Sequence, residues 1–461
     1  MVRVRYLTGT VARLGALLHV PKEAVDAEKL KADLTVPNGA YWSALSAGVS
    51  TNLEPHIELF QETETEFAVP RHYKVEFTKE VKVLDRRPAA AQLGFELSHT
   101  IELRDAVQEE ASNALTSDLD DKILSLSCGK GKTVVSLHGA TEAKRFPLLV
   151  VVHTNALMDQ WRDQIEKFIR RTDGEPLKVG HIQAGVADWK GCAVAVAMLH
   201  SLCLKEYPPE FYNYWRHVIF DEAHRLGANM FSMAASQFAC PRWGLSATHQ
   251  REDKMDKVFK LHLGKVCYQN LEQPLKPKVY FISTGISVNL TRYIFRRGKV
   301  NLSKMTTDLA DNEQRTQLIQ FWVDKAYKDG RTILVLGERL SQLHALYEGC
   351  SASSKSLHVG DMDSVERREA LKCKVVFATQ QLAKEGLDRP AFDTLFILHP
   401  FGGEGRLQQS IGRILRIHDE KKEPRVLVFE DNVGIVQALA NKMRKHLRSM
   451  GFEARNVKGR G

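Results

Sequence analysis

A glycine-rich turn follows a short apolar run between Ile123 and Thr133. Glycines let backbone N–H groups approach phosphate oxygens, and the start of a following helix adds a positive field. In such a turn Lys132 would reach the β- and γ-phosphates of a nucleotide, and the Thr133 hydroxyl would bind Mg²⁺. Leu126 stands where the general phosphate-loop pattern has glycine, so an ordinary glycine-rich turn between a strand and a helix remains the alternative. The match covers the core motif alone, which is Gly129, Lys130, Gly131, Lys132 and Thr133.

Two acids, Asp221 and Glu222, come directly after the apolar segment 217–220. An acid at the carboxyl end of a buried parallel strand lies beside the phosphate loop in an open α/β sheet. Asp221 could then hold Mg²⁺, directly or through water, and Glu222 could polarise the attacking water. Acids in the first turn of a helix are the alternative. Because a phosphate loop lies at domain-scale distance upstream, the sequence favours the catalytic interpretation.

These side chains need a scaffold, and the chain alternates short apolar runs with helical segments. Such an alternation predicts buried strands in a parallel sheet wrapped by helices. The predicted strands are 123–126, 148–152, 194–198, 218–220, 244–246, 332–336, 374–378, 394–398 and 425–429. The chain of 461 residues is therefore predicted to be α/β, with two tandem parallel-sheet domains after a small α+β N-terminal domain.

The composition shifts predict five parts. They are an accessory domain at 1–92, a first α/β domain at 93–272, a linker with a basic-aromatic hairpin at 273–310, a second α/β domain at 311–435, and a C-terminal helix with a mobile basic tail at 436–461. In the accessory domain we predict strands at 2–6, 73–77 and 81–83, and a helix start at 21–25 with proline in its first turn.

The composition limits the class of protein. With 43% hydrophobic and 26% charged residues, the chain is globular and has apolar cores. No apolar run approaches the ~20 residues of a membrane span, and the start lacks a signal-peptide pattern, so we expect a cytoplasmic rather than a membrane or secreted protein. Seven scattered cysteines without a Cys-x-x-Cys pair argue against disulfides and zinc. A net charge of +9 is compatible with a polyanionic partner.

With these residues the chain resembles the DEAH-box helicases and translocases of superfamily 2, because further blocks occur in the order of that family. The blocks are 149–157 with Trp161, 195–202, 246–248, 378–379 with 385–388, and 409–416. Singly, each could be an ordinary turn or a solvated helix face. The resemblance implies that both α/β domains are RecA-like, that ATP and Mg²⁺ are the cofactors, and that nucleic acid is the partner. It also implies that the accessory domain at 1–92 binds DNA, for which an interaction module is the alternative.

The resemblance also implies roles for residues around the nucleotide. In the second domain, the residues that would act on the γ-phosphate or on its attacking water are Arg413, Arg416 and Gln409. An arginine brought to the γ-phosphate from another domain contributes a factor of about 10³–10⁵ to the rate of hydrolysis. ATP would close the two domains and hydrolysis would open them. Gly386 and Asp388 would contact the nucleotide from the second domain.

An upstream block resembles the family segment whose glutamine contacts adenine. It supplies Gln108, with Arg104 beside it, although Ala106 and Val107 replace the usual Pro-Tyr. A plain helix surface is the alternative for Gln108.

Further residues would couple hydrolysis to movement and bind the nucleic acid. The coupling set is His224, Ser246 and Thr248. The nucleic-acid set is Thr154, Asn155, His200, Ser201, Arg251 and Thr379, with Arg296 and Arg297 from the basic-aromatic segment. Lysine and arginine bind phosphates while aromatic faces stack on unpaired bases, but a charged surface hairpin is the alternative for this segment.

The segment 243–253, which ends in Arg251-Glu252-Asp253, resembles the XPB-type DNA-repair helicases. The compact layout is similar to the phage UvsW-type helicases, which remodel branched DNA. The departures are Ser127 and His153, where proline is usual, and a solvated helix start is the alternative for 251–253.

The resemblance therefore implies an ATP-dependent helicase or translocase that acts on branched or duplex DNA and holds a single strand in its motor cleft. Fork regression, branch migration and unwinding in replication, recombination or repair are the expected activities. We expect a monomer in a bacterial or phage-infected cell. An RNA helicase, a restriction-type motor subunit and a non-catalytic binding scaffold are the alternatives.

Overall fold

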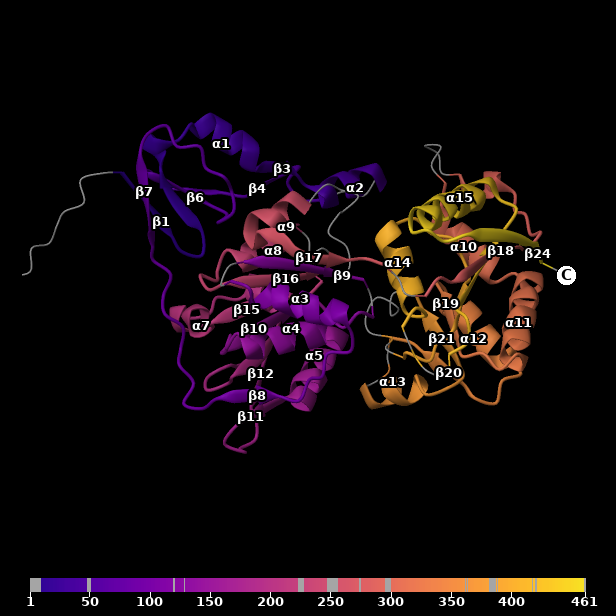
Figure 1. Cartoon of the computed structure of the whole chain (residues 1–461). Coiled ribbons are helices and arrows are strands. Elements are labelled where there is room, and N and C mark those ends of the chain that lie inside the picture. Colours follow the sequence, from indigo (N-terminus) through magenta and orange to yellow (C-terminus); the bar gives the residue numbers. More distant parts are fainter. Residues whose placement is uncertain are drawn as a thin grey trace, which may run out of the picture. The chain divides into compact units, whose positions relative to one another are not determined.

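The computed structural model describes residues 10–47, 51–118, 121–127, 129–222, 228–246, 256–272, 275–294, 300–360, 362, 364–380, 387, 389–416, 418 and 421–459. The chain divides into two compact units. The first comprises 1–127 and 131–271, and the second comprises 272–461 together with the short segment 128–130. Figure 1 colours the first unit from indigo to rose and the second from salmon through orange to yellow.

The first unit is built on an eight-stranded sheet that is parallel except for its edge strand β13. Its spatial order is β13 (Val186–Asp188), β12 (Val179–Gln183), β14 (Val194–Met198), β10 (Leu148–Val152), β15 (His217–Phe220), β16 (Arg242–Ser246), β9 (Lys122–Leu126) and β17 (Lys265–Asn270). The five strands predicted in this range all form. Strands β14, β10, β15, β16 and β9 are buried over their whole length, as expected for a sheet covered on both faces.

Helices cover both faces of this sheet because successive side chains of a strand point to opposite sides. Leu148 and Val150 of β10 pack with α3 (Ala106–Thr116), α4 (Lys132–Glu142) and α5 (Asn155–Phe168). Leu149 and Val151 face the other cluster, which includes α6 (Leu199–Leu204), α7 (Pro209–Tyr214), α8 (Ala228–Ala235) and α9 (Asp256–Leu263). A separate pair, β8 (Leu97–His99) and β11 (Ile169–Arg171), is antiparallel.

The N-terminal part of the first unit has its own five-stranded sheet, in the order β5 (Gln61–Glu62), β6 (Glu66–Val69), β2 (Leu18–Pro21), β1 (Thr10–Leu14) and β7 (Val81–Asp85). The helices α1 (Ala27–Leu34) and α2 (Gly39–Ala47) and the hairpin of β3 (Thr35–Pro37) and β4 (His56–Glu58) complete it. Its apolar side chains belong to the same buried cluster as the α6–α9 face of the large sheet. The predicted small α+β domain is thus present, packed on the first sheet.

Two local predictions in this domain are wrong. The segment 73–77 is not a strand, because within it only Phe77 forms a bridge, to Val25. The predicted helix start is the short 3-10 helix η1 (Lys22–Ala24), and α1 begins later, where Asp26 accepts a hydrogen bond from the N–H of Lys29. The predicted strand 2–6 lies outside the described residues.

The second unit has a seven-stranded sheet whose strands are all parallel. The order is β20 (Lys355–His358), β21 (Val375–Thr379), β19 (Ile333–Gly337), β22 (Thr394–Ile397), β23 (Arg425–Glu430), β18 (Lys278–Ser283) and β24 (Ala454–Lys458). The helical elements are η3 (Leu290–Tyr293), α10 (Leu302–Ala310), α11 (Glu313–Lys328), α12 (Leu340–Gly349), α13 (Ser364–Ala370), α14 (Glu404–Gly412) and α15 (Gly434–Ser449). Two helix-covered parallel sheets after an α+β domain confirm the predicted fold class.

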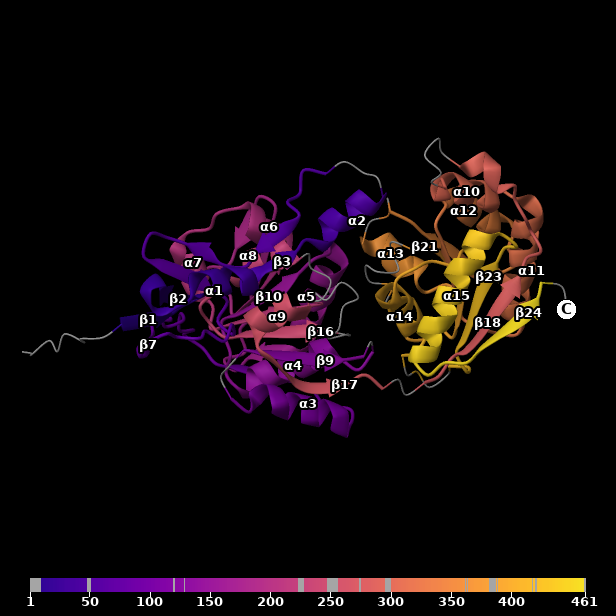
Figure 2. The same ribbon diagram turned by 90° about the horizontal axis from the view of Figure 1, so that it is seen from above.

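The structure corrects the predicted linker and tail. β18 lies within the predicted linker 273–310, yet it pairs with β23 and β24 inside the second sheet. The predicted mobile tail contains β24, which is held because the chain turns back at Gly451, with φ 76°, and buries Phe452. Figure 2 shows α15 and β24 beside β18 and β23. Because this segment is basic and half exposed, its sequence pattern did not indicate the strand of five residues.

Two general properties concern the described residues only. None of their helices is both long and apolar enough to span a bilayer. Their six cysteines are all free thiols.

Candidate functional site

The glycine-rich turn joins the carboxyl end of β9 to the first residue of α4, so its backbone lies at the positive end of a helix. Gly129 and Gly131 have φ values of 84° and 81°, a conformation that side chains disfavour. A Cβ atom built on Gly131 would lie 2.5 Å from Nε2 of Gln108. Both glycines are therefore required by the shape of the turn, which is a cradle of the kind that binds phosphate.

Gln108, on α3, lies against this cradle and is only 5% exposed. Its Oε1 accepts the backbone N–H of Arg104 at 2.8 Å, which fixes the amide orientation. The Arg104 side chain is 47% exposed, and its Nε donates to Asp105 at 2.9 Å. Gln108 is thus buried beside the turn, in contrast to the plain helix surface of the alternative interpretation.

The acid pair after β15 meets the lysine of the turn. Lys132 Nζ lies 3.4 Å from Oε1 of Glu222 and donates to the carbonyl of Leu126 at 3.3 Å. Glu222 has a φ of 50°, an uncommon conformation for a residue other than glycine, which turns the chain sharply after the strand. The structure therefore brings together the lysine and the glutamate that the sequence singled out separately.

Asp221 is 4% exposed and accepts two hydrogen bonds. Trp161 Nε1 donates to Oδ2 at 2.8 Å, and the N–H of Glu222 donates to Oδ1 at 2.9 Å. Burial, followed by the charge of Glu222, raises the pKa of Asp221 to about 6, against the opposing effects of Trp161 and Lys132. The sequence analysis placed Trp161 with the block 149–157 and gave it no role at this carboxylate, because the two residues lie 60 positions apart in the chain.

The oxygen donors here fit a hard divalent cation. Thr133 is the second residue of α4, and Asp221 and Glu222 add carboxylates. Hydroxyl and carboxylate oxygens are the ligands that Mg²⁺ prefers, and a cation would relieve the repulsion between two neighbouring acids. Ser246 is 3% exposed and ends β16, where it pairs in register with Ser125 of β9, the strand that leads into the turn.

Four predicted nucleic-acid contacts follow β10 and β14 at the same edge of the sheet. Asn155 and His200 are exposed, and Asn155 Oδ1 accepts from Gln183 at 2.7 Å. Thr154 caps α5, since its hydroxyl accepts the N–H of Leu157 at 3.3 Å.

Ser201 is largely buried beside them. It is 8% exposed, and its hydroxyl accepts the N–H of Ala184 at 2.9 Å. The Ser201 hydroxyl therefore supports a backbone turn, at which Ala184 has a φ of 49°, and its contact with nucleic acid stays a prediction.

In the second unit the predicted residues follow β21 and β22. Thr379 is the last residue of β21, Gln409 lies on α14, and Arg413 is the C-cap of that helix. An Arg413 guanidinium N–H donates to the carbonyl of Leu387 at 3.3 Å. Arg416 lies three residues beyond. All four residues are half-buried, and Thr379 lies at the carboxyl end of a parallel strand, where α/β sheets bind ligands.

Seven predicted residues lie outside the described part of the chain. They are His224, Thr248, Arg251, Arg296, Arg297, Gly386 and Asp388.

Known proteins resemble this chain in sequence. The family model described as type III restriction enzyme, res subunit, matches residues 100–251. A protein of Acanthamoeba polyphaga mimivirus, named as an ATP-dependent RNA helicase, is 28% identical over 320 residues, which are 67% of this chain and 60% of the relative. The DNA 3'-5' translocase XPB2 of Sulfurisphaera tokodaii is 33% identical over 179 residues, 39% of this chain and 38% of the relative. The chain thus spans less than two thirds of either relative.

One solved structure has a fold similar to that of this chain. S. cerevisiae Dbp5 bound to RNA and ADP BeF3 superposes with a TM-score of 0.54 at 13% identity, over 77% of this chain and 90% of that one. At this identity the likeness concerns the fold alone. The matched family model and the named relatives therefore show that the chain is similar to helicases and translocases, and the solved structure shares its fold of two tandem parallel-sheet domains.

Proposed function

We propose that this protein is an ATP-driven translocase that remodels branched DNA by fork regression, branch migration or unwinding. The observation that carries the ATPase part is the approach of Lys132 Nζ to Glu222 Oε1, 3.4 Å apart, beside a cradle formed by two left-handed glycines. A lysine, an acid pair and a helix start in one place are the groups that phosphoryl transfer requires.

Each group of the first unit has a proposed role. Lys132 and the backbone N–H groups of 129–131 bind the phosphates, and Gln108 recognises adenine from its fixed position behind Gly131. When bound by Thr133 and Asp221, Mg²⁺ would neutralise phosphate charge. Glu222 orients and polarises the attacking water, while Trp161 holds Asp221 in place.

The second unit is proposed to complete the reaction. Arg413 and Arg416 supply positive charge to the departing γ-phosphate, and Gln409 positions the water. Ser246, His224 and Thr248 are proposed to couple hydrolysis to movement. Asn155, His200, Thr379 and the basic residues Arg251, Arg296 and Arg297 are proposed to grip the nucleic acid, with 1–92 as an accessory domain.

The choice of DNA rests on the resemblance to XPB-type and UvsW-type helicases and on the name of the Sulfurisphaera relative, a DNA translocase. A second candidate is an RNA helicase, which the name of the mimivirus relative favours. The two differ in the track that stimulates ATP hydrolysis, so the same assay separates them.

The test is the rate of ATP hydrolysis by the full chain with no nucleic acid, single-stranded RNA, linear duplex DNA and a four-way DNA junction. We expect the junction to stimulate most and Lys132→Ala to abolish turnover on every substrate. Strongest stimulation by RNA would replace the DNA proposal, and turnover unaffected by Lys132→Ala would overturn the site itself.

A further inference from the structure

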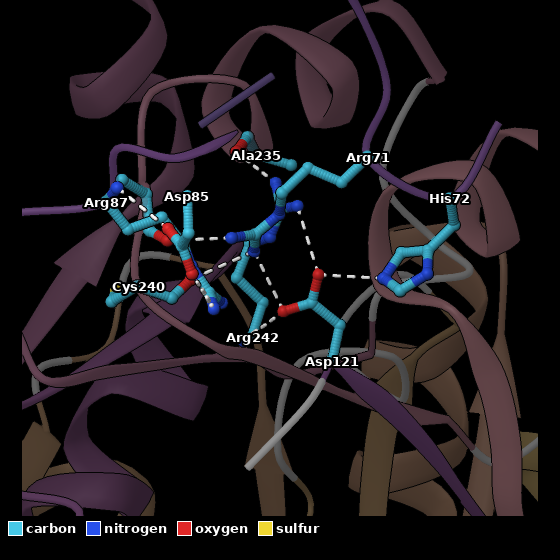
Figure 3. A network of polar contacts seen from close by, with 9 residues as sticks. Arg71, His72, Asp85, Arg87, Asp121, Ala235, Cys240 and Arg242 are labelled. Carbon is cyan, nitrogen blue, oxygen red and sulfur yellow. Dashed lines mark hydrogen bonds and ion pairs between the residues drawn. The ribbon is translucent and has the colours of Figure 1, made fainter. Parts of the chain in front are cut away.

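A buried arginine of the N-terminal domain binds the first large sheet through polar contacts. Arg71 lies just after β6, and its side chain is 4% exposed. Its guanidinium donates to the carbonyls of Ala239 and Cys240 at 2.7 and 2.9 Å, and to Oδ1 of Asp121 at 2.8 Å (Figure 3). Three hydrogen bonds to three separate acceptors fix both the position and the angle of this group.

The neighbouring residue strengthens the same attachment. His72 Nε2 lies 2.9 Å from Oδ2 of Asp121, and the backbone N–H of His72 donates to the carbonyl of Leu261 in α9. The contact is thus made by a carboxylate, three carbonyls and two adjacent residues of the N-terminal domain.

In the first large sheet, Asp121 connects the amino ends of the neighbouring strands β9 and β16 through hydrogen bonds. It immediately precedes β9, and it accepts the backbone N–H and a guanidinium N–H of Arg242, the first residue of β16, at 2.7 and 3.2 Å. The carboxyl ends of these same strands carry the glycine-rich turn and Ser246. The N-terminal domain is therefore attached to the two strands that support the candidate nucleotide site.

The charges show that Arg71 is not needed to neutralise Asp121. Burial raises the pKa of Asp121, but Arg242, His72 and Arg71 together hold it well below its usual range. Burial, with the charge of Arg242, lowers the pKa of Arg71 to about 9. Arg242 alone would balance the carboxylate, so Arg71 is a second buried cation whose desolvation must be offset by its contacts.

We propose that Arg71 is a positioning residue that locks the N-terminal domain to β9 and β16, so that the domain and the nucleotide-holding sheet move as one body. The domain then serves as a fixed arm that transmits ATP-driven movement to the nucleic acid. The transmission step rests on the proposed function, while the locking step stands on the contacts alone.

The test compares Arg71→Ala and Arg71→Lys with Arg86→Ala, an exposed arginine of the same domain, in the full chain. Hydrogen exchange should rise in 10–85 and at the amino ends of β9 and β16 in Arg71→Ala, while Arg86→Ala matches the wild type. Arg71→Lys should lie between them, since lysine keeps the charge but cannot reach all three acceptors. Unchanged exchange in Arg71→Ala overturns the locking step, even for a protein without ATPase activity.

The transmission step has its own readout. Hydrolysis of ATP without nucleic acid should stay within about twofold of wild type in Arg71→Ala, while strand displacement per ATP hydrolysed should fall about tenfold, a typical coupling between sites. Parallel losses in both rates would indicate a general structural defect and contradict a role in transmission.

Discussion

The ion pair of Lys132 and Glu222 shows how two largely buried charges are stabilised in the protein before a nucleotide binds. Their side chains are 11% and 14% exposed, so each charge is largely removed from water and needs a partner. The lysine finds one in Glu222 and a second in the carbonyl of Leu126. Phosphate oxygens would take over this lysine, which would release Glu222 to act on water.

Replacing Glu222 by Gln should separate binding from hydrolysis. Glutamine keeps the shape of the side chain but cannot act as a base, so hydrolysis should fall about 10²–10⁴-fold. Nucleotide binding, measured by titration with a fluorescent ATP analogue, should stay near wild type. Lys132→Ala is the comparison variant and should lose binding as well. Normal turnover by Glu222→Gln would show that another group activates the water.

Gln108 should determine the preference for adenine. Removing its amide in Gln108→Ala deletes hydrogen bonds worth about 1 kcal/mol each and should raise KM for ATP with little change for GTP. Steady-state kinetics with both nucleotides measure this. Glu109→Ala is the matched control, because it removes an exposed side chain of the same helix and leaves the hydrogen bond between Gln108 and the N–H of Arg104 in place. Equal changes for both nucleotides would argue against adenine recognition.

At the scale of elements, the continuous burial of the central parallel strands explains why they form where the apolar runs of the sequence predict them. A run such as Leu148–Val152 can only be stable when helices cover both of its faces. β24 differs, because its pattern is half exposed and rich in charge, with Arg455 and Lys458. Its position on the edge of β18 depends on pairing with a strand about 170 residues away, which local sequence does not reveal.

The burial of Phe452 provides a test of this strand. Phe452 is 4% exposed in the cluster formed by α14, α15 and the sheet. Phe452→Ala should lower the free energy of unfolding of the second unit by about 3–5 kcal/mol, as for other buried phenylalanines. Urea unfolding followed by circular dichroism measures it, with exposed Glu453→Ala as the control. A variant as stable as the wild type would restore the idea of a mobile tail.

At the scale of the whole molecule, the first unit contains two folded parts that share one apolar cluster and one buried polar network. Apolar contact supplies most of the stabilisation but little direction, because the hydrophobic effect is not directional. The hydrogen bonds of Asp121 with Arg71, His72 and Arg242 add the angular constraint. This combination explains how a small domain can be held in one orientation on a large sheet.

The same network predicts a pH dependence of stability. The pKa of Asp121 is lower in the folded protein than the ordinary value near 3.9, so its contribution is complete above about pH 4–5 and declines as the pH falls. Asp121→Asn, which leaves two buried guanidinium groups without a carboxylate, should cost about 3–5 kcal/mol at pH 7. Urea unfolding from pH 7 to pH 3 should show this difference shrinking toward acid. A difference that stays constant with pH would exclude Asp121 as its source.

The sequence by itself predicted those elements and candidate site residues that are recognised from residues close together in the chain. The apolar runs predicted the central strands of both large sheets, while β12, β13, β17, β18, β20 and β24 were not predicted. The glycine-rich turn next to Lys132 and Thr133 could be recognised directly. Short-range order of this kind follows from backbone conformation and from the alternation of side chains along a strand.

Only the tertiary structure decided which distant groups meet. Trp161 reaches Asp221, Gln108 packs behind Gly131, and β24 joins β18, each across a long stretch of chain. Arg71 and Asp121 carried no motif, because an ion pair has no preferred sequence spacing and acquires its strength from burial. Ser201 shows the converse: its sequence block resembles a contact strand, yet packing turns its hydroxyl to the backbone.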